Sequence, residues 1–192
     1  MQIDLDDVLV ELRGESGAVA SAILHGLASN GAAIVSRDGQ ALAQILIVLL
    51  PLLPQGGLDL APALLAARSA ADAMRIRGSG RVIFVLSAAA GMPMRRHGDY
   101  SVQMAGALTV MRTLAMQCGP AVLVNAVGVG AIGEPLIAGD AAMLGHASVK
   151  RVGTISEVVD TVLFFCDPAN TYTTGQMLCV DGGWSAGYGR SF

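Results

Sequence analysis

Charged and aromatic residues are both scarce in this 192-residue chain, and lysine is almost absent. Only 14% of the residues are charged and 4% are aromatic, while 53% are hydrophobic. An average soluble domain carries about 25% charged residues. Eleven of the 12 basic residues are arginine, which leaves Lys150 as the only lysine. This composition excludes intrinsic disorder, and the surplus of apolar residues suggests that another chain covers part of the surface.

Runs of basic residues and clusters of metal ligands are also lacking. The net charge is −3 and the basic residues are scattered, so the sequence offers no stripe that would neutralise nucleic-acid phosphates. The three cysteines and three histidines show no ligand spacing, and we expect no metal site. We expect the cysteines to be small core residues in a reducing compartment. These residues are Cys118, Cys166, Cys179, His25, His97 and His146.

No segment has the character of a signal peptide or a membrane span. Residues Met1–Asp7 are acidic, where a signal peptide would be basic. The most apolar run, Ile45–Leu53, is interrupted by Pro51 and is much shorter than the roughly 20 residues that a span needs. We therefore expect a soluble, cytoplasmic protein that does not contact the membrane.

Short apolar runs alternate with segments of helical length. This alternation predicts an α/β fold, a Rossmann-like doubly wound parallel sheet, in one domain over residues 1–192. The predicted strands are Val8–Leu12, Ala32–Ser36, Ile45–Leu50, Arg81–Leu86, Ala121–Ala126 and Gln176–Val180. The predicted helices are Ser16–Asn30, Leu58–Arg77, Tyr100–Cys118 and Ser156–Cys166.

One connection is too short for a regular parallel sheet. Only residues 37–44 separate two of the predicted strands, whereas a parallel crossover needs about a dozen residues or more. These strands therefore cannot be neighbours in an ordinary βαβ unit. We expect the fold to be truncated in its N-terminal half, with a βα crossover missing near residues 37–44.

A series of segments from Gly78 onward resembles the short-chain dehydrogenase/reductase family. Their order and spacing extend over more than a hundred residues, so the resemblance is more specific than any single motif, and Gly14 to Ala32 fits more loosely. The segments are Gly80–Gly91, Tyr100–Met104, Val124–Val127, Arg151–Thr154 with Glu157, Thr174–Gln176 and Val180–Gly183.

The resemblance implies a catalytic set of which little remains. Enzymes of the family use serine, tyrosine and lysine to move a hydride between NAD(P) and an alcohol or ketone. The tyrosine position is kept as Tyr100, but the lysine position one turn later is Met104. Without a nearby cation, a phenol with a pKa near 10 is a poor base at pH 7. Lys150 lies outside that helix and is not expected to replace the lost cation.

The serine and asparagine positions of the family are also altered. Ser87 is the only hydroxyl in its segment, yet an alignment anchored on Gly91 puts Ala88 at the catalytic position. The family's helix asparagine falls on Asp59. We therefore treat Tyr100 and Ser87 as vestigial.

The family's nucleotide-binding features are lost as well. A glycine-rich turn before the first helix would hold the pyrophosphate. Here the first glycine is kept as Gly14, while the other two are Ala18 and Ala20, and Glu15 adds a negative charge. The stretch Val48–Pro51 lacks the family's paired asparagines. We expect no cofactor on this chain, with NAD(P) bound instead by a partner subunit.

The features that build subunit contacts in the family are kept. Small residues on the two central helices would allow close approach in a four-helix interface, and Asp181–Gly183 matches a turn at a second interface. The small residues are Ala63, Ala66, Ala67, Ala70, Ala105 and Gly106. We favour a non-catalytic subunit that joins an active paralogue in a two-plus-two hetero-oligomer. Two alternatives stay open: a degenerate but active oxidoreductase using Tyr100 and Ser87, and a homo-oligomeric ligand-binding scaffold.

Overall fold

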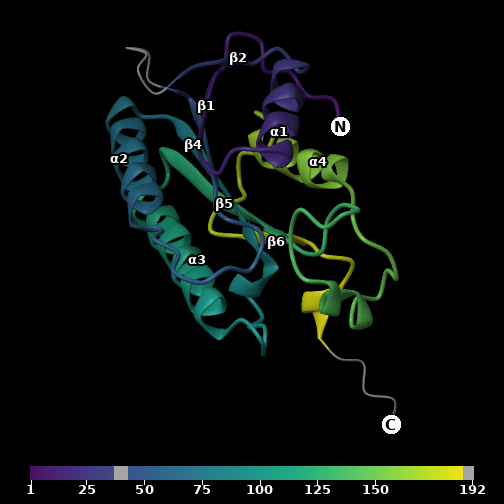
Figure 1. The fold of residues 1–192 in the computed structure, drawn as a ribbon. Coiled ribbons are helices and arrows are strands. Elements are labelled where there is room, and N and C mark those ends of the chain that lie inside the picture. The colour runs from purple at the N-terminus through teal and green to yellow at the C-terminus, as the bar shows by residue number, and fades with distance from the viewer. Residues whose placement is uncertain (37–42, 188–192) are drawn as a thin grey trace.

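Parallel strands in the order β2-β1-β3-β4-β5-β6 form one sheet in the computed structural model, which describes residues 1–36 and 43–187 (Figure 1). Every adjacent pair of these strands is parallel. The predicted α/β class and parallel sheet are therefore confirmed. The strands are β1 Leu9–Gly14, β2 Ala33–Ile34, β3 Ile45–Leu49, β4 Gly80–Ser87, β5 Val122–Val129 and β6 Met177–Val180.

Two helices cover each face of the sheet. Helices α2 and α3 lie side by side on one face, and α1 and α4 pack together on the other (Figure 1). All four helices were predicted to within a few residues. Their bounds are α1 Ala18–Ala28, α2 Ala61–Arg77, α3 Gly98–Cys118 and α4 Ile155–Cys166. Three short 3-10 turns are η1 Ala88–Ala90, η2 Ala141–Gly145 and η3 Trp184–Ala186.

Strand β3 connects the two hydrophobic cores. All five of its residues are buried. Leu46 and Val48 belong to the core beneath α2 and α3, while Ile45, Ile47 and Leu49 belong to the core beneath α1 and α4. Because successive side chains of a strand point to opposite faces, a strand covered on both faces has an uninterrupted apolar sequence.

Helix α4 starts slightly earlier than its sequence suggested. Ser156 was the expected first residue, but the helix begins at Ile155 with Thr154 as its N-cap. The Glu157 amide donates to Oγ1 of Thr154, and the Thr154 amide donates to Oε2 of Glu157. This reciprocal capping box satisfies two amide groups that the helix itself leaves unpaired.

The strands before and after the short connection lie on opposite sides of β1. Val10 is in register with Ile34 of β2 on one side and with Ile45 of β3 on the other. The expectation that these strands are not neighbours is therefore correct. Most of the segment predicted to lack a crossover, residues 37–44, lies outside the described residues.

The end of β1 approaches β3 so closely that only glycine fits. Gly14 has φ +109°, and a Cβ built on it would lie 1.9 Å from the Leu49 carbonyl oxygen. The next residue, Glu15, donates its amide to that same oxygen at 2.9 Å. Gly14 is thus required by strand packing, whatever is bound nearby.

We predict that Gly14→Ala destabilises the protein more than Gly17→Ala. Gly17 also has a positive φ, +123°, but a Cβ there would meet nothing within 4 Å. Gly17→Ala should cost about 1–3 kcal/mol for backbone strain alone. Gly14→Ala should cost a further 1–3 kcal/mol, roughly, because the Leu49 carbonyl must move. Denaturant unfolding of both variants measures the difference, and equal losses would contradict the close approach.

Candidate functional site

The carboxyl ends of β1 and β3 form the place where a doubly wound fold usually binds its ligand. Strand order reverses here, because β2 lies on one side of β1 and β3 on the other. A cavity of about 300 Å³ lies at this edge, lined by Glu15, Ser16 and Ala18 and by residues 49–53. That volume is at the lower end for ligand sites, which span roughly 300–1,000 Å³.

The residues at this cavity fit a dinucleotide poorly. Helix α1 has no side-chain cap, so its first amide groups could attract an anion. The Glu15 carboxylate lines the same cavity, however, and would repel a pyrophosphate. Of the other residues in the turn, Ala18 is exposed and Ala20 is buried. The one kept glycine, Gly14, is accounted for by its contact with Leu49.

Tyr100 is a buried residue whose hydroxyl is already engaged. It belongs to the first turn of α3, is only 3% exposed and packs in the core beneath α2 and α3. Its hydroxyl donates to the carbonyl oxygen of Pro51 at 2.8 Å. Pro51 follows β3, in the stretch where the family's asparagines would stand. The residue that the sequence marked as vestigial is thus almost completely buried.

Burial raises the pKa of Tyr100 to about 12, although its hydrogen bond to Ser87 opposes this shift. A phenol with a raised pKa keeps its proton at neutral pH. The protonated Tyr100 side chain contributes its full stabilisation of the fold below pH 10, the ordinary pKa of a phenol. This stabilisation is lost as the pH rises through the raised pKa of about 12. A general base for alcohol oxidation needs the opposite shift, toward the working pH.

Ser87, the only hydroxyl of its segment, lies beside the tyrosine. Ser87 is the last residue of β4 and is fully buried. Its Oγ accepts the Ala89 amide at 3.1 Å, and it hydrogen-bonds to Tyr100. Ala88 is also buried and begins the turn η1. The structure thus brings together the two residues that the sequence marked as vestigial, Tyr100 and Ser87.

Met104 lies where the family has its lysine, one turn after Tyr100, and is completely buried in the apolar core. Lys150 is exposed and donates to the carbonyl of Gly145, in the segment after β5. The core around Met104 would strongly disfavour a charged group.

Asp59 stands at the start of α2. Its carboxylate accepts the amide of Ala61, the first residue of the helix, at 3.0 Å. An acidic side chain at this end of a helix is stabilising because it pairs with a free amide and complements the helix dipole. This contact gives Asp59 a structural role.

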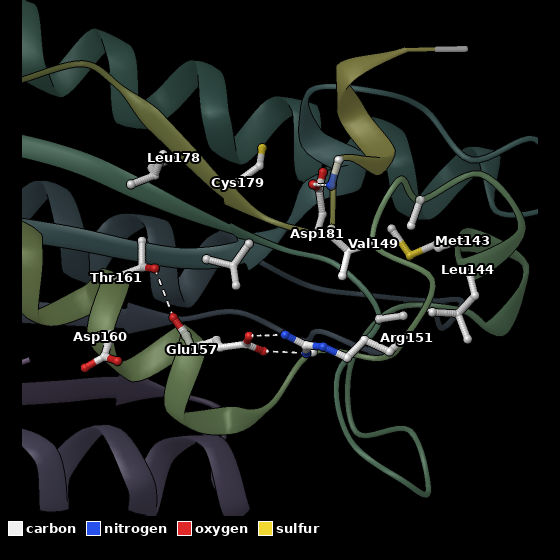
Figure 2. A pocket seen from close by; sticks show the side chains of 16 residues that line it. Met143, Leu144, Val149, Arg151, Glu157, Asp160, Thr161, Leu178, Cys179 and Asp181 are labelled. Atoms are coloured by element: carbon white, nitrogen blue, oxygen red, sulfur yellow. Dashed lines mark hydrogen bonds and ion pairs between the residues drawn. The ribbon is translucent and has the colours of Figure 1, made fainter. Parts of the chain in front are cut away.

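A larger cavity of about 530 Å³ lies between α4, β6 and residues 143–153 (Figure 2). Figure 2 shows Arg151 reaching toward Glu157 on α4, and their closest atoms, Nη2 and Oε1, are 2.6 Å apart. The hydrogen bond from Arg151 lowers the pKa of Glu157 to about 2. None of the predicted site residues lines this cavity. Sequence patterns could not reveal it, because its walls come from segments far apart in the chain.

Neither a metal-binding cluster nor a membrane-spanning helix occurs in the part of the chain that the structure describes. Within residues 1–36 and 43–187, no group of three or more His, Cys, Asp or Glu side chains could hold a metal ion. Over the same residues, no helix combines the length and the apolar character needed to span a bilayer. The three cysteines are free thiols; Cys118 and Cys166 are buried, and Cys179 is partly so.

Comparison with known proteins gives matches at the level of both sequence and fold. A family model described as enoyl-(acyl carrier protein) reductase matches residues 58–185. Trans-4-hydroxycyclohexanecarboxylate dehydrogenase of Sinomonas cyclohexanicum is 30% identical over 131 residues, which cover 68% of this chain and 50% of that protein. A tropinone reductase homolog of Datura stramonium is 29% identical over 123 residues, covering 58% of this chain and 46% of that protein. The matches thus span about half the length of these relatives.

Solved structures with the same fold are more distant in sequence. A gluconate 5-dehydrogenase from Burkholderia cenocepacia, in complex with NADP and tartrate, superposes with a TM-score of 0.80 at 17% identity. That superposition covers 96% of this chain and 97% of the other. A short-chain oxidoreductase from Pseudomonas aeruginosa, described as having an atypical catalytic center, gives 0.74 at 19% identity, with 94% and 98% covered.

We predict that Met104→Lys destabilises the protein by about 3–5 kcal/mol, because it buries an unpaired ammonium group. Met104→Leu is the matched control and should cost less than about 1.5 kcal/mol, since it keeps the volume and the apolar character. We also expect no NAD(P)-dependent turnover from the lysine variant. Denaturant unfolding and a dehydrogenase assay test the two parts. A lysine variant as stable as the leucine variant would show that the position opens to solvent.

Proposed function

The chain belongs to the short-chain dehydrogenase/reductase family, and from this premise we propose that it is a non-catalytic member that assembles with an active, NAD(P)-dependent alcohol dehydrogenase paralogue. In this assembly the chain completes subunit interfaces and stabilises its partner. The chemistry takes place in the partner, which binds the nucleotide.

The hydrogen bond from Tyr100 to Pro51 is the observation that carries this proposal. The hydroxyl that would exchange a proton with substrate is buried and donates to a backbone carbonyl. The cation that would lower its pKa is replaced by the buried Met104. Both changes favour a protonated, structural tyrosine at neutral pH.

We propose further that this chain holds no nucleotide of its own. The supporting observations are the Glu15 carboxylate at the α1 cavity and the modest volume of that cavity. A dinucleotide would place its pyrophosphate near this negative charge, and the lining residues within 1–36 and 43–187 include no compensating cation.

The exposed face of α3 supports a helix-to-helix subunit contact. Val102 is 71% exposed and Met116 is 78% exposed, with the small residues Ala105 and Gly106 on the surface between them. The hydroxyl of Thr109 donates to the Ala105 carbonyl of its own helix and needs no other partner. Such a face loses little hydrogen bonding when another helix covers it.

The contribution of α2 to this surface differs from the sequence expectation at one position. Ala67 is completely buried and packs into the core, so it cannot contact a partner. Ala63, Ala66 and Ala70 are partly exposed, and Leu65 and Ile76 are 65% and 81% exposed. The α2 surface is therefore more apolar than its alanines alone suggested.

A second contact is proposed at the edge of the sheet formed by β6. Leu178 on this strand is 46% exposed, and Val149 nearby is 48% exposed. Both line the cavity of Figure 2. An apolar hollow beside an edge strand suits the side chains of a second subunit, since both the apolar surface and the strand edge would be covered.

The assembly we propose has two copies of each chain and works in the cytoplasm. It resembles the dehydrogenase for 2-[hydroxy(phenyl)methyl]succinyl-CoA in anaerobic toluene degradation, whose inactive subunit also lacks a cofactor site. By this resemblance, the partner oxidises a hydroxyacyl-CoA during aromatic degradation. The loss of nucleotide-site residues in this chain supports the likeness.

One observation favours a second candidate function. Ser87 hydrogen-bonds to Tyr100, so two members of the family's catalytic set remain together. An active oxidoreductase with a degenerate site would use this pair. The other alternative, a homo-oligomeric ligand-binding scaffold, predicts stable assembly without a paralogue.

Replacing Tyr100 by phenylalanine separates the two main candidates. In the purified assembly we expect Tyr100→Phe to leave turnover per assembled complex unchanged, because the hydroxyl takes no part in proton transfer. Tyr172→Phe makes the same change at a fully exposed side chain and serves as the control. Turnover lost in Tyr100→Phe, but not in the control, would establish the degenerate enzyme instead.

Gly106 tests the proposed α3 contact. A Cβ at this position would meet nothing within 4 Å, so Gly106→Arg should leave the chain folded. We expect this variant to lose the partner subunit, because its long side chain would keep another helix away. Gly106→Ala is the matched control, which should retain the partner. Native mass spectrometry of each purified variant measures the assembly, and an intact complex with arginine at this position would contradict the contact.

A further inference from the structure

Helices α2 and α3 lie side by side, and each carries a stripe of exposed residues on the side that faces away from the core (Figure 1). The residues of each stripe recur at intervals of three or four positions, which places them on one side of the helix. We call the two stripes together the α2–α3 surface. They consist of Leu65, Arg68, Asp72 and Ile76 on α2, and of Val102, Ala105, Thr109, Arg112 and Met116 on α3.

The α2–α3 surface carries positive charge that it does not neutralise itself. Neither Arg68 nor Arg112 forms an ion pair with any residue in 1–36 or 43–187. The stripes contain one carboxylate, Asp72, and its Oδ1 lies 3.7 Å from Nε of Arg75 on the same helix. The surface is thus positive, although the whole chain has a net charge of −3.

The two arginines lie at similar heights along the helix pair. Each helix leads from the end of one parallel strand to the start of the next, so α2 and α3 run in the same direction. Burial raises the pKa of the Cys118 thiol at the end of α3, and the charges of Asp72 and Arg75 have smaller effects of opposite sign. These two residues of α2 therefore lie near that end of α3. At 1.5 Å per residue, Arg68 stands about 6 Å before Asp72 along its helix, and Arg112 about 9 Å before Cys118. One helix pair that covers this surface would meet both cations.

A second copy of this chain would be a poor occupant of the surface. In a two-fold pair both copies contribute the same residues, so Arg68 and Arg112 would each occur twice. Neither copy would supply an available carboxylate from these stripes, since Asp72 already pairs with Arg75. Covered cations lose their water and repel one another. The exposed apolar side chains favour covering of the surface, and the charges then decide which chain covers it.

We propose that the α2–α3 surface binds a helix pair of a different chain, which presents acidic side chains opposite Arg68 and Arg112. This inference rests on the proposed partner role and adds the chemistry by which the partner is recognised. A carboxylate can accept two parallel hydrogen bonds from one guanidinium group, so an acidic partner both neutralises and orients each arginine. The same arginines disfavour a second copy of the chain, which gives discrimination as well as attraction.

Charge reversal tests the two arginines. Each variant replaces the original chain in the source organism and is purified with its partner, and native mass spectra over a dilution series give the dissociation constant. The double variant Arg68→Glu, Arg112→Glu should weaken the complex by about tenfold or more, because attraction to acidic side chains becomes repulsion. Both side chains are exposed, so we expect this variant to fold, and circular dichroism checks that it does.

The matched control is the double variant Arg95→Glu, Arg96→Glu. It reverses two exposed arginines in the segment before α3, outside both stripes, and should bind the partner as the original chain does. Gly106→Arg provides the opposite reference, because it blocks the same helix face by size alone. Loss of the partner in Gly106→Arg, with unchanged affinity in the folded charge-reversed variant, would refute the inference and leave the proposed function intact. Original protein purified without any second chain would instead overturn the proposed function.

Salt tests the same inference without a variant. Raising ammonium acetate from about 50 mM to about 500 mM shortens the distance over which charges act, so ion pairs across the surface weaken. We expect the dissociation constant of the original complex to rise by roughly tenfold over this range. Apolar side chains offer no charge for salt to screen. A dissociation constant that does not change with salt would therefore contradict recognition by charge.

Discussion

The hydrogen bond between the Tyr100 hydroxyl and the Pro51 carbonyl is the contact on which the account depends. It joins the start of α3 to the segment that follows β3, across the edge where this fold would bind a nucleotide and a substrate. Two residues before Pro51, the Leu49 carbonyl lies against Gly14 and accepts the Glu15 amide. Backbone carbonyls of Leu49 and Pro51 thus contact both the turn after β1 and Tyr100. In the family, these two positions are the nucleotide-binding turn and the catalytic tyrosine. Loss of the hydrogen-bond partner of a buried hydroxyl destabilises the fold, so this arrangement favours a structural role for Tyr100.

The same residues that disfavour catalysis stabilise the fold. Met104 fills the core where a lysine would need solvent or a cofactor as neighbour, and Asp59 accepts an amide at the start of α2. Large apolar side chains are exposed on α2, on α3 and on the edge strand β6. Since apolar surface is stabilised by being covered, these faces suit subunit contacts better than they suit solvent.

Much of the fold could be predicted from the sequence because strands buried on both faces have distinctive apolar runs, as in Ile45–Leu49. The altered positions Met104, Glu15 and Ala18 could also be predicted from the sequence, because each is located by its spacing from other residues of the same segment. What could not be predicted depends on contacts between segments. Only the structure shows that Ser87 lies beside Tyr100, that Pro51 accepts the tyrosine hydroxyl, and that Ala67 faces the core.

Native mass spectrometry of the protein purified from its source, without a tag on any partner, tests the central claim most directly. The account predicts a mixed assembly with a second, longer dehydrogenase chain, and bound nucleotide in proportion to that chain alone. A homo-oligomer of the 192-residue chain would contradict the account. Nucleotide bound to such a homo-oligomer would identify a degenerate enzyme, and its absence would indicate a ligand-binding scaffold.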